Sequence, residues 1–346
     1  MKNTKVLLSV RSVKKYFPIK GKSAFSKKRV LKANEDISFD VYEGETFALV
    51  GESGSGKSTL GKCIVRLHEP TFGEIVYYQG ENPVSITQCK PQRMRALRKD
   101  LQIIFQDPYS SLNPKMTVAS LIAEGVITHG YYKKNSKELQ EYVLGIMQKC
   151  GLSIDALNRY PHQFSGGQRQ RVCIARALAI KPKFIVCDEC VSALDASVQS
   201  QILNLLMQLK TQEKLTYLFI THDLGVVRHI ADRVAVMYLG EIVEIGENER
   251  IFSSPLHPYT IALLSAMPTI DGEKKERILL GSQLPSAIRP PTGCKFHTRC
   301  FMAQEICKTH APKLEKAENG NLVRCHFAQI KTEEKEKMSA KKGEKE

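Results

Sequence analysis

Short apolar runs alternate with helical patterns in the middle of the chain. Fully apolar runs at 184–187 and 217–220 are typical of central strands in a parallel sheet. Between them, apolar residues from Val198 to Leu209 recur at three- and four-residue spacing, which predicts a helix. Strand, helix and strand in this order form a βαβ unit, so we expect an α/β fold.

Other parts of the chain have strand patterns bounded by polar turns. A helical pattern covers 117–150, and 234–238 with 241–245 predicts a hairpin-type pair of strands. A polar loop is expected at 21–29. The remaining expected strands are 5–16, 36–50, 74–79 and 101–105.

The pattern changes near 268–285, where we expect a domain boundary. After Pro268 the chain is loop-rich, with further prolines at 285, 290 and 291. We therefore predict a main domain at 1–268, with a helical part at about 107–165, and an extension at 269–330. Residues 331–346 mix Lys and Glu with few apolar residues, which predicts a disordered tail.

Charge and hydropathy bear on where the protein works. The net charge is +15, and residues 1–34 contain eleven Lys or Arg and no acid. Such an arm can contact nucleic acid or an anionic membrane, and a solvated face beside a negative leaflet is the simpler reading. No run of 18 apolar residues and no secretory signal pattern is present, so we expect a cytosolic protein that docks on a membrane partner.

A glycine-rich segment follows the apolar run that ends at Val50. It fits the pattern G-x-x-x-x-G-K-[ST], in which backbone N–H groups surround phosphates. We expect Lys57 to contact the β and γ phosphates and Ser58 to bind Mg²⁺. The predicted nucleotide-binding residues are Gly51, Glu52, Ser53, Gly54, Ser55, Gly56, Lys57, Ser58 and Thr59.

Two carboxylates end the apolar run at 184–187. We expect Asp188 to hold Mg²⁺ and Glu189 to act as general base on the attacking water. Alone this pattern is weak, because many strands end in acidic residues, but behind a phosphate loop it supplies the second half of one site.

A second candidate anion site begins at Ser165, which is expected to cap a helix running to about Ile180. Gly166 and Gly167 leave the helix start bare for a phosphate, and Gln168 follows them. A second phosphate-binding helix in one chain suggests a nucleotide site that is completed across two subunits.

Together these motifs resemble an ABC ATPase over residues 5–268. The resemblance implies a P-loop NTPase fold with an antiparallel β subdomain, a helical subdomain and a small loop-rich, Cys-containing C-terminal extension. It implies that Ser165 to Gln168 form the signature that grips the γ-phosphate on the partner subunit. Gln106 matches the Q-loop that touches Mg²⁺ and water, Asp195 the D-loop and His222 the switch histidine. Phe17, with Tyr16 as the adjacent alternative, matches the aromatic that stacks on adenine.

A narrower resemblance is to the oligopeptide/dipeptide permease ATP-binding subunits. It rests on 106–114, on His257 to Thr260 and on the C-terminal cysteines. It implies an ATPase that energises peptide import with a second related ATPase, two transmembrane subunits and an extracytoplasmic binding protein, at the cytoplasmic face of the membrane. Nickel importers share much of the pattern, and a soluble ABC ATPase acting on nucleic acid or ribosomes is the alternative from another class.

Cys190 departs from that subfamily, which has Pro at this position after the Asp-Glu pair. We expect hydrolysis to survive because both carboxylates remain. Since Pro fixes φ and Cys does not, the loop that leads to Asp195 is expected to be less rigid.

Four cysteines gather in the extension: Cys294, Cys300, Cys307 and Cys325. Four thiolates can hold Zn²⁺ or a [4Fe–4S] cluster, free thiols are the plain alternative, and the cytosol disfavours disulfides. His297, His310 and His326 are alternative zinc ligands. The subfamily resemblance favours the iron–sulfur cluster.

Overall fold

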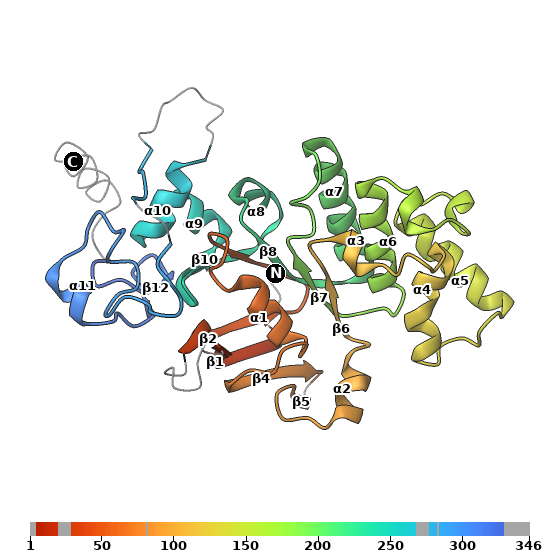
Figure 1. The fold of residues 1–346 in the computed structure, drawn as a ribbon, viewed down its shortest axis with the longest axis horizontal. Coiled ribbons are helices and arrows are strands. Elements are labelled where there is room, and N and C mark those ends of the chain that lie inside the picture. The colour runs from red at the N-terminus through yellow and green to blue at the C-terminus, as the bar shows by residue number, and fades with distance from the viewer. Residues whose placement is uncertain (1–4, 20–28, 81, 268–276, 282–283, 329–346) are drawn as a thin grey trace. The chain divides into compact units, whose positions relative to one another are not determined.

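A computed structural model describes residues 5–19, 29–80, 82–267, 277–281 and 284–328 (Figure 1). The chain forms two compact units. Unit 1 contains 5–8, Val41–Thr46 and, apart from residue 81, Tyr77–Ile220; unit 2 contains the described parts of Ser9–Asp40, Phe47–Val76 and 221–328. The predicted division at 268 stays a prediction. Its boundary region lies partly outside the described residues, and the charged tail at 331–346 lies wholly outside them.

Unit 1 is built on parallel strands with helices between them. Strands β6 (Leu101–Ile104), β7 (Phe184–Asp188) and β8 (Thr216–Thr221) are parallel neighbours, with Ile104 opposite Cys187 and Cys187 opposite Phe219. Helix α7 (Ala196–Glu213) connects β7 to β8, which confirms the predicted βαβ unit. All five residues of β7 are buried, as the continuous apolar run predicts.

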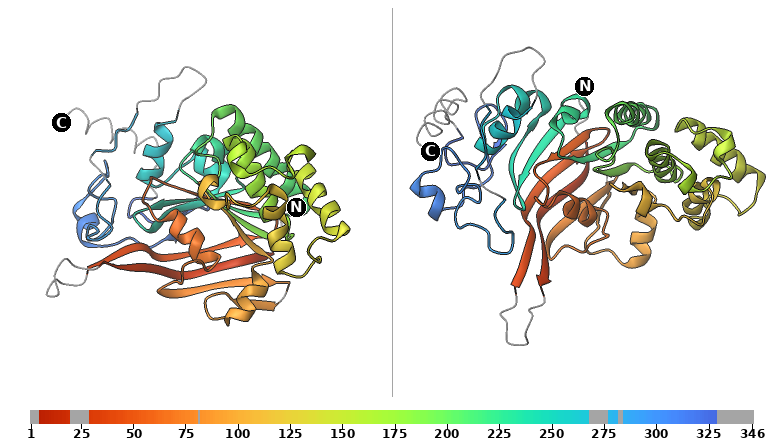
Figure 2. Two further views of the ribbon diagram at one scale, coloured as in Figure 1. Left: turned by 45° about the vertical axis from the view of Figure 1, so that its right-hand side comes forward. Right: turned by 45° about the horizontal axis from the view of Figure 1, so that its top comes forward.

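The other helices of unit 1 begin with side-chain caps where the sequence offers them. Helices α4 (Val118–Thr128) and α5 (Lys137–Lys149) start after Thr117 and Ser136, whose hydroxyls accept N–H bonds from Ser120 and Leu139. The two helices pack with α6 (Gly166–Leu178), and Figure 2 shows them as one yellow-green group. The remaining elements are β5 (Asn82–Ser85), α2 (Pro91–Leu97), α3 (Pro108–Ser111), η1 (Ile154–Ala156) and η2 (Pro161–Gln163).

Unit 2 contains a mixed sheet in the order β11-β12-β10-β9-β3. Strand β3 (Thr46–Val50) is parallel to β9 (Arg233–Tyr238), which pairs antiparallel with β10 (Glu241–Glu247), as the hairpin pattern predicts. Strands β12 (Leu322–Val323) and β11 (Glu315–Lys316) extend this sheet from the C-terminal extension. The extension therefore belongs to the same sheet as the strand that precedes the phosphate loop.

A second sheet holds the long N-terminal strands β2 (Arg29–Tyr42), β1 (Val6–Ile19) and β4 (Phe72–Gln79), in that order, with β5 next to β4 (Figure 2). The strand predicted at 36–50 is in fact two strands. The chain turns between β2 and β3 at Gly44, whose φ is +75°, a backbone conformation that favours glycine.

The core of unit 2 joins strands, helices and extension. Helices α8 (Leu224–Ile230), α9 (Asn248–Ser253) and α10 (Pro258–Ser265) cover β3, β9 and β10. Phe296, Cys300 and Met302 of the extension are buried in the same cluster. The other helices are α1 (Lys57–Ile64) and α11 (Glu305–Thr309).

Candidate functional site

The phosphate loop (residues 51–59) leaves β3 and enters α1, in the strand–loop–helix context that its sequence requires. Gly51 has φ +148°, and a Cβ there would lie 2.1 Å from the Met237 carbonyl oxygen. Gly56 has φ +102°, and a Cβ there would lie 2.1 Å from the Ala33 carbonyl oxygen. These two glycines let the loop lie tightly against β9 and β2.

Lys57 is the first residue of α1, and its side chain folds back over the loop. Its side chain is 4% exposed, and its Nζ donates to the carbonyl oxygens of Gly51 at 2.7 Å and Glu52 at 2.9 Å. The N-cap Gly56 supplies no side-chain cap to α1. A positive charge beside uncapped helix N–H groups is chemistry that fits a nucleotide's phosphates.

Three residues that support the loop were not predicted from the sequence. The buried Asn34 on β2 donates from Nδ2 to the Gly56 carbonyl at 3.1 Å. Tyr259 on α10 accepts the Glu52 N–H at 2.9 Å, and Arg299 of the extension pairs with the Glu52 carboxylate. Tyr259 and Arg299 lie in segments that carry the subfamily resemblance, but no sequence pattern connects them with the loop.

The two candidate adenine-stacking residues are neighbours on β1 and both are half-buried. Tyr16 donates its hydroxyl to Glu35 at 2.6 Å, and burial followed by that bond raises its pKa. Phe17 meets His68 edge-on at 5.6 Å, and the Lys15 ammonium lies 4.7 Å from its ring centre. Because successive side chains of a strand point to opposite faces, only one of them can face a given ligand.

The predicted switch histidine, His222, belongs to unit 2 and directly follows β8. It is exposed in the turn before α8. The next residue, Asp223, caps α8 by accepting the Gly225 N–H at 2.8 Å. This cap fixes where the turn ends, beside the histidine.

The two carboxylates of unit 1 stand at the end of β7. Asp188 is the last residue of the strand and is 4% exposed. Glu189 has φ +47°, a strained conformation for a residue with a side chain, and its N–H donates to the Ile220 carbonyl at 2.9 Å. The Gln106 side-chain amide donates to the Glu189 carboxylate at 3.0 Å, so two predicted site residues far apart in sequence are brought together.

Cys190, expected from the sequence to depart from the subfamily pattern, directly follows Glu189 and is 2% exposed. Its contact with the Cys187 thiol, together with burial, raises the pKa of Cys187. The expected loss of rigidity in the following loop stays a prediction.

The predicted signature forms the start of α6. Ser165 Oγ accepts the Gln168 N–H at 3.4 Å while Gln168 Oε1 accepts the Ser165 N–H at 3.1 Å, a capping box. A Cβ on Gly167 would lie 2.3 Å from Val198 Cγ1, so glycine is required for α6 to pack on α7. Asp195 caps α7 by accepting the Val198 N–H at 3.0 Å.

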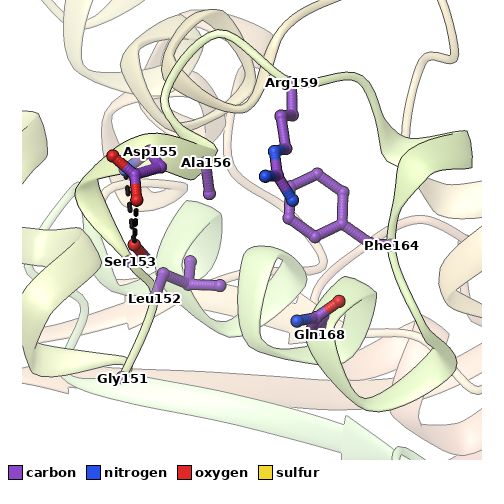
Figure 3. Close-up of a pocket in the computed structure, with 8 residues that line it drawn as sticks. All are labelled: Gly151, Leu152, Ser153, Asp155, Ala156, Arg159, Phe164 and Gln168. Atoms are coloured by element: carbon purple, nitrogen blue, oxygen red, sulfur yellow. Dashed lines mark hydrogen bonds between the residues drawn. The ribbon is translucent and has the colours of Figure 1, made fainter.

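A hollow of about 110 Å³ lies beside this segment (Figure 3). Arg159, Phe164 and Gln168 lie on one side of it, and the segment with Ser153 and Asp155 lies on the other. Ser153, on the facing turn, accepts the Asp155 N–H at 3.4 Å. The hollow is too small to hold a nucleotide, and it lies between the signature and the segment that packs beside it.

The four cysteines of the extension are reduced in this structure. Burial first, and then the neighbouring thiols of the group, raise the pKa of Cys294 to about 11 and that of Cys300 to about 12. Backbone N–H groups of Met302 and Phe327 donate to the sulfurs of Cys300 and Cys325 at 3.3 and 3.4 Å. Among the described residues, however, no three His, Cys, Asp or Glu side chains are grouped so that they could hold a metal ion.

Within the part of the chain that the structure describes, no helix has the length and apolar character needed to span a bilayer.

Comparison with known proteins agrees with these features. A family model described as "ABC transporter" matches residues 34–192, and one described as "Oligopeptide/dipeptide transporter, C-terminal region" matches residues 243–307. The oligopeptide transport ATP-binding protein AppF of Bacillus subtilis is 46% identical over 94% of this chain and 98% of its own length. OppF of Escherichia coli is 49% identical over 90% of this chain and 93% of its own length.

Solved structures share the fold. A dimeric ATP-binding cassette in a post-hydrolysis state with ADP and Pi matches with a TM-score of 0.61 at 28% identity, over 70% of this chain and 99% of that one. The chain therefore belongs to the oligopeptide/dipeptide permease family of ABC transporter ATP-binding proteins, and it is the ATPase subunit of an importer of that class.

Proposed function

We propose that this chain binds Mg²⁺-ATP at the phosphate loop and hydrolyses it with Glu189 as general base. Lys57 and the N–H groups at the start of α1 bind the β and γ phosphates. Ser58, Asp188 and Gln106 supply oxygen ligands for Mg²⁺, which neutralises phosphate charge when it is bound. His222 contacts the γ-phosphate, and Phe17 stacks on the adenine.

The observation that carries this proposal is the 3.0 Å hydrogen bond from Gln106 to Glu189. It joins the residue matched to the Q-loop with the residue matched to the general base, at the end of a buried strand. A carboxylate that accepts a hydrogen bond from an amide is held in one orientation, from which it can take a proton from a water molecule.

The signature acts on a nucleotide held by a second ATPase subunit. Ser165 and Gln168 are exposed and Gly166 is half-buried, while Gly167 is buried, so this helix start can bond the partner's γ-phosphate through its exposed residues. Closure on two ATP molecules draws the subunits together, and hydrolysis releases them. Two transmembrane subunits receive this motion, and an extracytoplasmic binding protein delivers the solute, so the chain works at the cytoplasmic face of the membrane without contacting nucleic acid.

The solute is an oligopeptide or dipeptide, because the similarity to peptide-transport ATPases extends through the C-terminal region. The test is uptake of a labelled peptide by vesicles that hold the complete transporter. We expect ATP-dependent uptake that Glu189→Gln abolishes while ATP binding persists. Uptake of Ni²⁺ without peptide uptake would overturn the substrate class, and rapid hydrolysis by Glu189→Gln would overturn the general base.

We also propose that Cys294, Cys300, Cys307 and Cys325 hold a [4Fe–4S] cluster. Two of these sulfurs, those of Cys300 and Cys325, accept backbone N–H bonds, which is the environment of cluster-ligating thiolates. The four described side chains are not grouped around a common centre in this structure. Anaerobic purification should yield iron and labile sulfide that Cys300→Ser removes and the matched Cys89→Ser retains. Stoichiometric zinc without iron would overturn the cluster.

A further inference from the structure

The C-terminal extension reaches the phosphate loop at Glu52, the second residue of the loop. Arg299 donates from Nη1 to Glu52 Oε2 at 2.8 Å and from Nη2 to Oε1 at 2.9 Å, a bidentate ion pair. The Arg299 side chain is only 6% exposed, and its Nε donates to the Gly281 carbonyl at 3.2 Å. A planar, buried and doubly bonded guanidinium holds a carboxylate in one orientation.

Glu52 is fixed at every polar group. Its N–H donates to the buried Tyr259 hydroxyl at 2.9 Å, and its carbonyl accepts from Lys57 Nζ at 2.9 Å. The ion pair with Arg299 therefore acts on the same residue whose carbonyl positions the phosphate-binding lysine. Tyr259 itself is held by Phe296, with ring centres 5.3 Å apart, so the extension reaches this contact as well.

A second connection reaches the middle of the loop, at Ser55. Lys295 of the extension donates to the Leu239 carbonyl at 3.0 Å and pairs with Glu241 at 3.1 Å. The next residue of that turn, Gly240, donates its N–H to the Ser55 carbonyl at 2.9 Å. The segment from Lys295 to Arg299 thus supports the loop at two points.

We infer that Arg299 is a positioning residue for nucleotide binding, through which the C-terminal extension sets the affinity of the phosphate loop for ATP. The inference rests on the proposed function of that loop. The Glu52 carboxylate lies in a loop that must accept a triphosphate, and like charges at short range disfavour binding. Arg299 neutralises this carboxylate and holds it in place.

The arrangement also connects nucleotide binding with the cysteine segment. Arg299 directly precedes Cys300, which is buried with Tyr238 and Phe296, and the Arg299 guanidinium lies 5.8 Å from the centre of the Tyr238 ring. A change in the fold of this segment therefore moves the guanidinium that pairs with the loop.

The test measures the dissociation constant of a fluorescent ATP analogue with Mg²⁺ on the full-length chain. Arg299→Gln leaves the carboxylate uncompensated, and we expect the constant to rise about tenfold. Glu52→Gln removes the carboxylate that Arg299 neutralises, so in a Glu52→Gln chain the further change Arg299→Gln should raise the constant by no more than about threefold. The double variant should bind more tightly than Arg299→Gln alone, because neither charge remains.

Arg324→Gln is the matched control, because Arg324 lies in the same extension and donates to the carbonyls of Ile242 and Pro312. It should bind like wild type. An unchanged constant for Arg299→Gln, or a double variant as weak as Arg299→Gln alone, would overturn the inference. Arg299→Lys keeps the positive charge but loses the bidentate geometry, so its dissociation constant should lie between those of wild type and Arg299→Gln. It replaces Arg299→Gln as the test if that variant does not fold. Failure of the wild type to bind the analogue would instead overturn the proposed function.

Discussion

Two glycine-containing helix starts in the chain match phosphate-binding motifs, and their N-termini are capped in different ways. At α1 the N-cap is Gly56, which supplies no side-chain cap, and the residues around it are held from outside the helix. At α6 the N-cap Ser165 and Gln168 cap each other in a capping box. One helix start is thus open to a ligand within a single chain, while the other is satisfied by its own side chains.

This difference separates two ways of making an anion site. The phosphate loop is supported by Asn34, Tyr259 and Arg299, all outside α1, so its backbone is held in shape without a side-chain cap on the helix. The signature is supported by its own capping box and by the packing of Gly167 on α7. A site of the second kind suits a ligand that arrives with another subunit, because the helix is stable until then.

The largest expected effect comes from the open site. Lys57→Ala removes the buried ammonium that the loop carbonyls hold, and we expect ATP binding by the isolated chain to weaken at least about a hundredfold. Equilibrium titration with labelled ATP measures it. Lys62→Ala, on the same helix, should bind as wild type does. Retained affinity in Lys57→Ala would mean that the signature, rather than the loop, binds ATP in the single chain.

The second effect separates binding from chemistry. Glu189→Gln keeps the acceptor for the Gln106 amide and removes the base, so we expect turnover in the assembled transporter to fall about a hundredfold or more. ATP affinity should stay within about threefold. Steady-state phosphate release measures it, with Glu213→Gln on α7 as the control. A loss of affinity equal to the loss of turnover would show that Glu189 positions the nucleotide instead.

The sequence predicts these two sites because each motif is local. The loop at 51–59, the carboxylates after β7 and the cap of α6 depend on short patterns beside a strand or helix, and each lies on the expected element. The supports of the loop could not be predicted in this way. Arg299 and Glu52 are 247 residues apart, and their pairing depends on tertiary packing, which leaves no periodic signal. The same holds for β5 and α2, whose short segments begin beside or at proline and lack a clear period.

A change in the signature should lower ATP turnover only when two ATPase subunits are assembled. Ser165→Ala removes the hydroxyl that accepts the Gln168 N–H, and we expect about 1 kcal/mol of lost stability and about a tenfold loss of turnover in the assembled transporter. ATP binding by the isolated chain should be unchanged. Ser136→Ala, which removes the equivalent cap from α5, is the matched control because it costs similar stability without touching nucleotide. Equal turnover in both variants would mean that Ser165 serves its helix alone.

The smallest effect concerns the adenine base of the nucleotide. It shows which face of β1 supplies the aromatic ring that stacks on the base. Stacking on an aromatic ring contributes about 1–3 kcal/mol per base, so Phe17→Ala should weaken ATP binding at least about fivefold. Inorganic tripolyphosphate has no base, and its displacement of labelled ATP from the loop should be unaffected. Tyr16→Ala is the control, because Tyr16 is bonded to Glu35 and points to the other face of the strand. If Tyr16→Ala instead weakens the binding of ATP but not of tripolyphosphate, the stacking residue is Tyr16. The base of the nucleotide then lies on the face of β1 from which Tyr16 reaches Glu35 of β2.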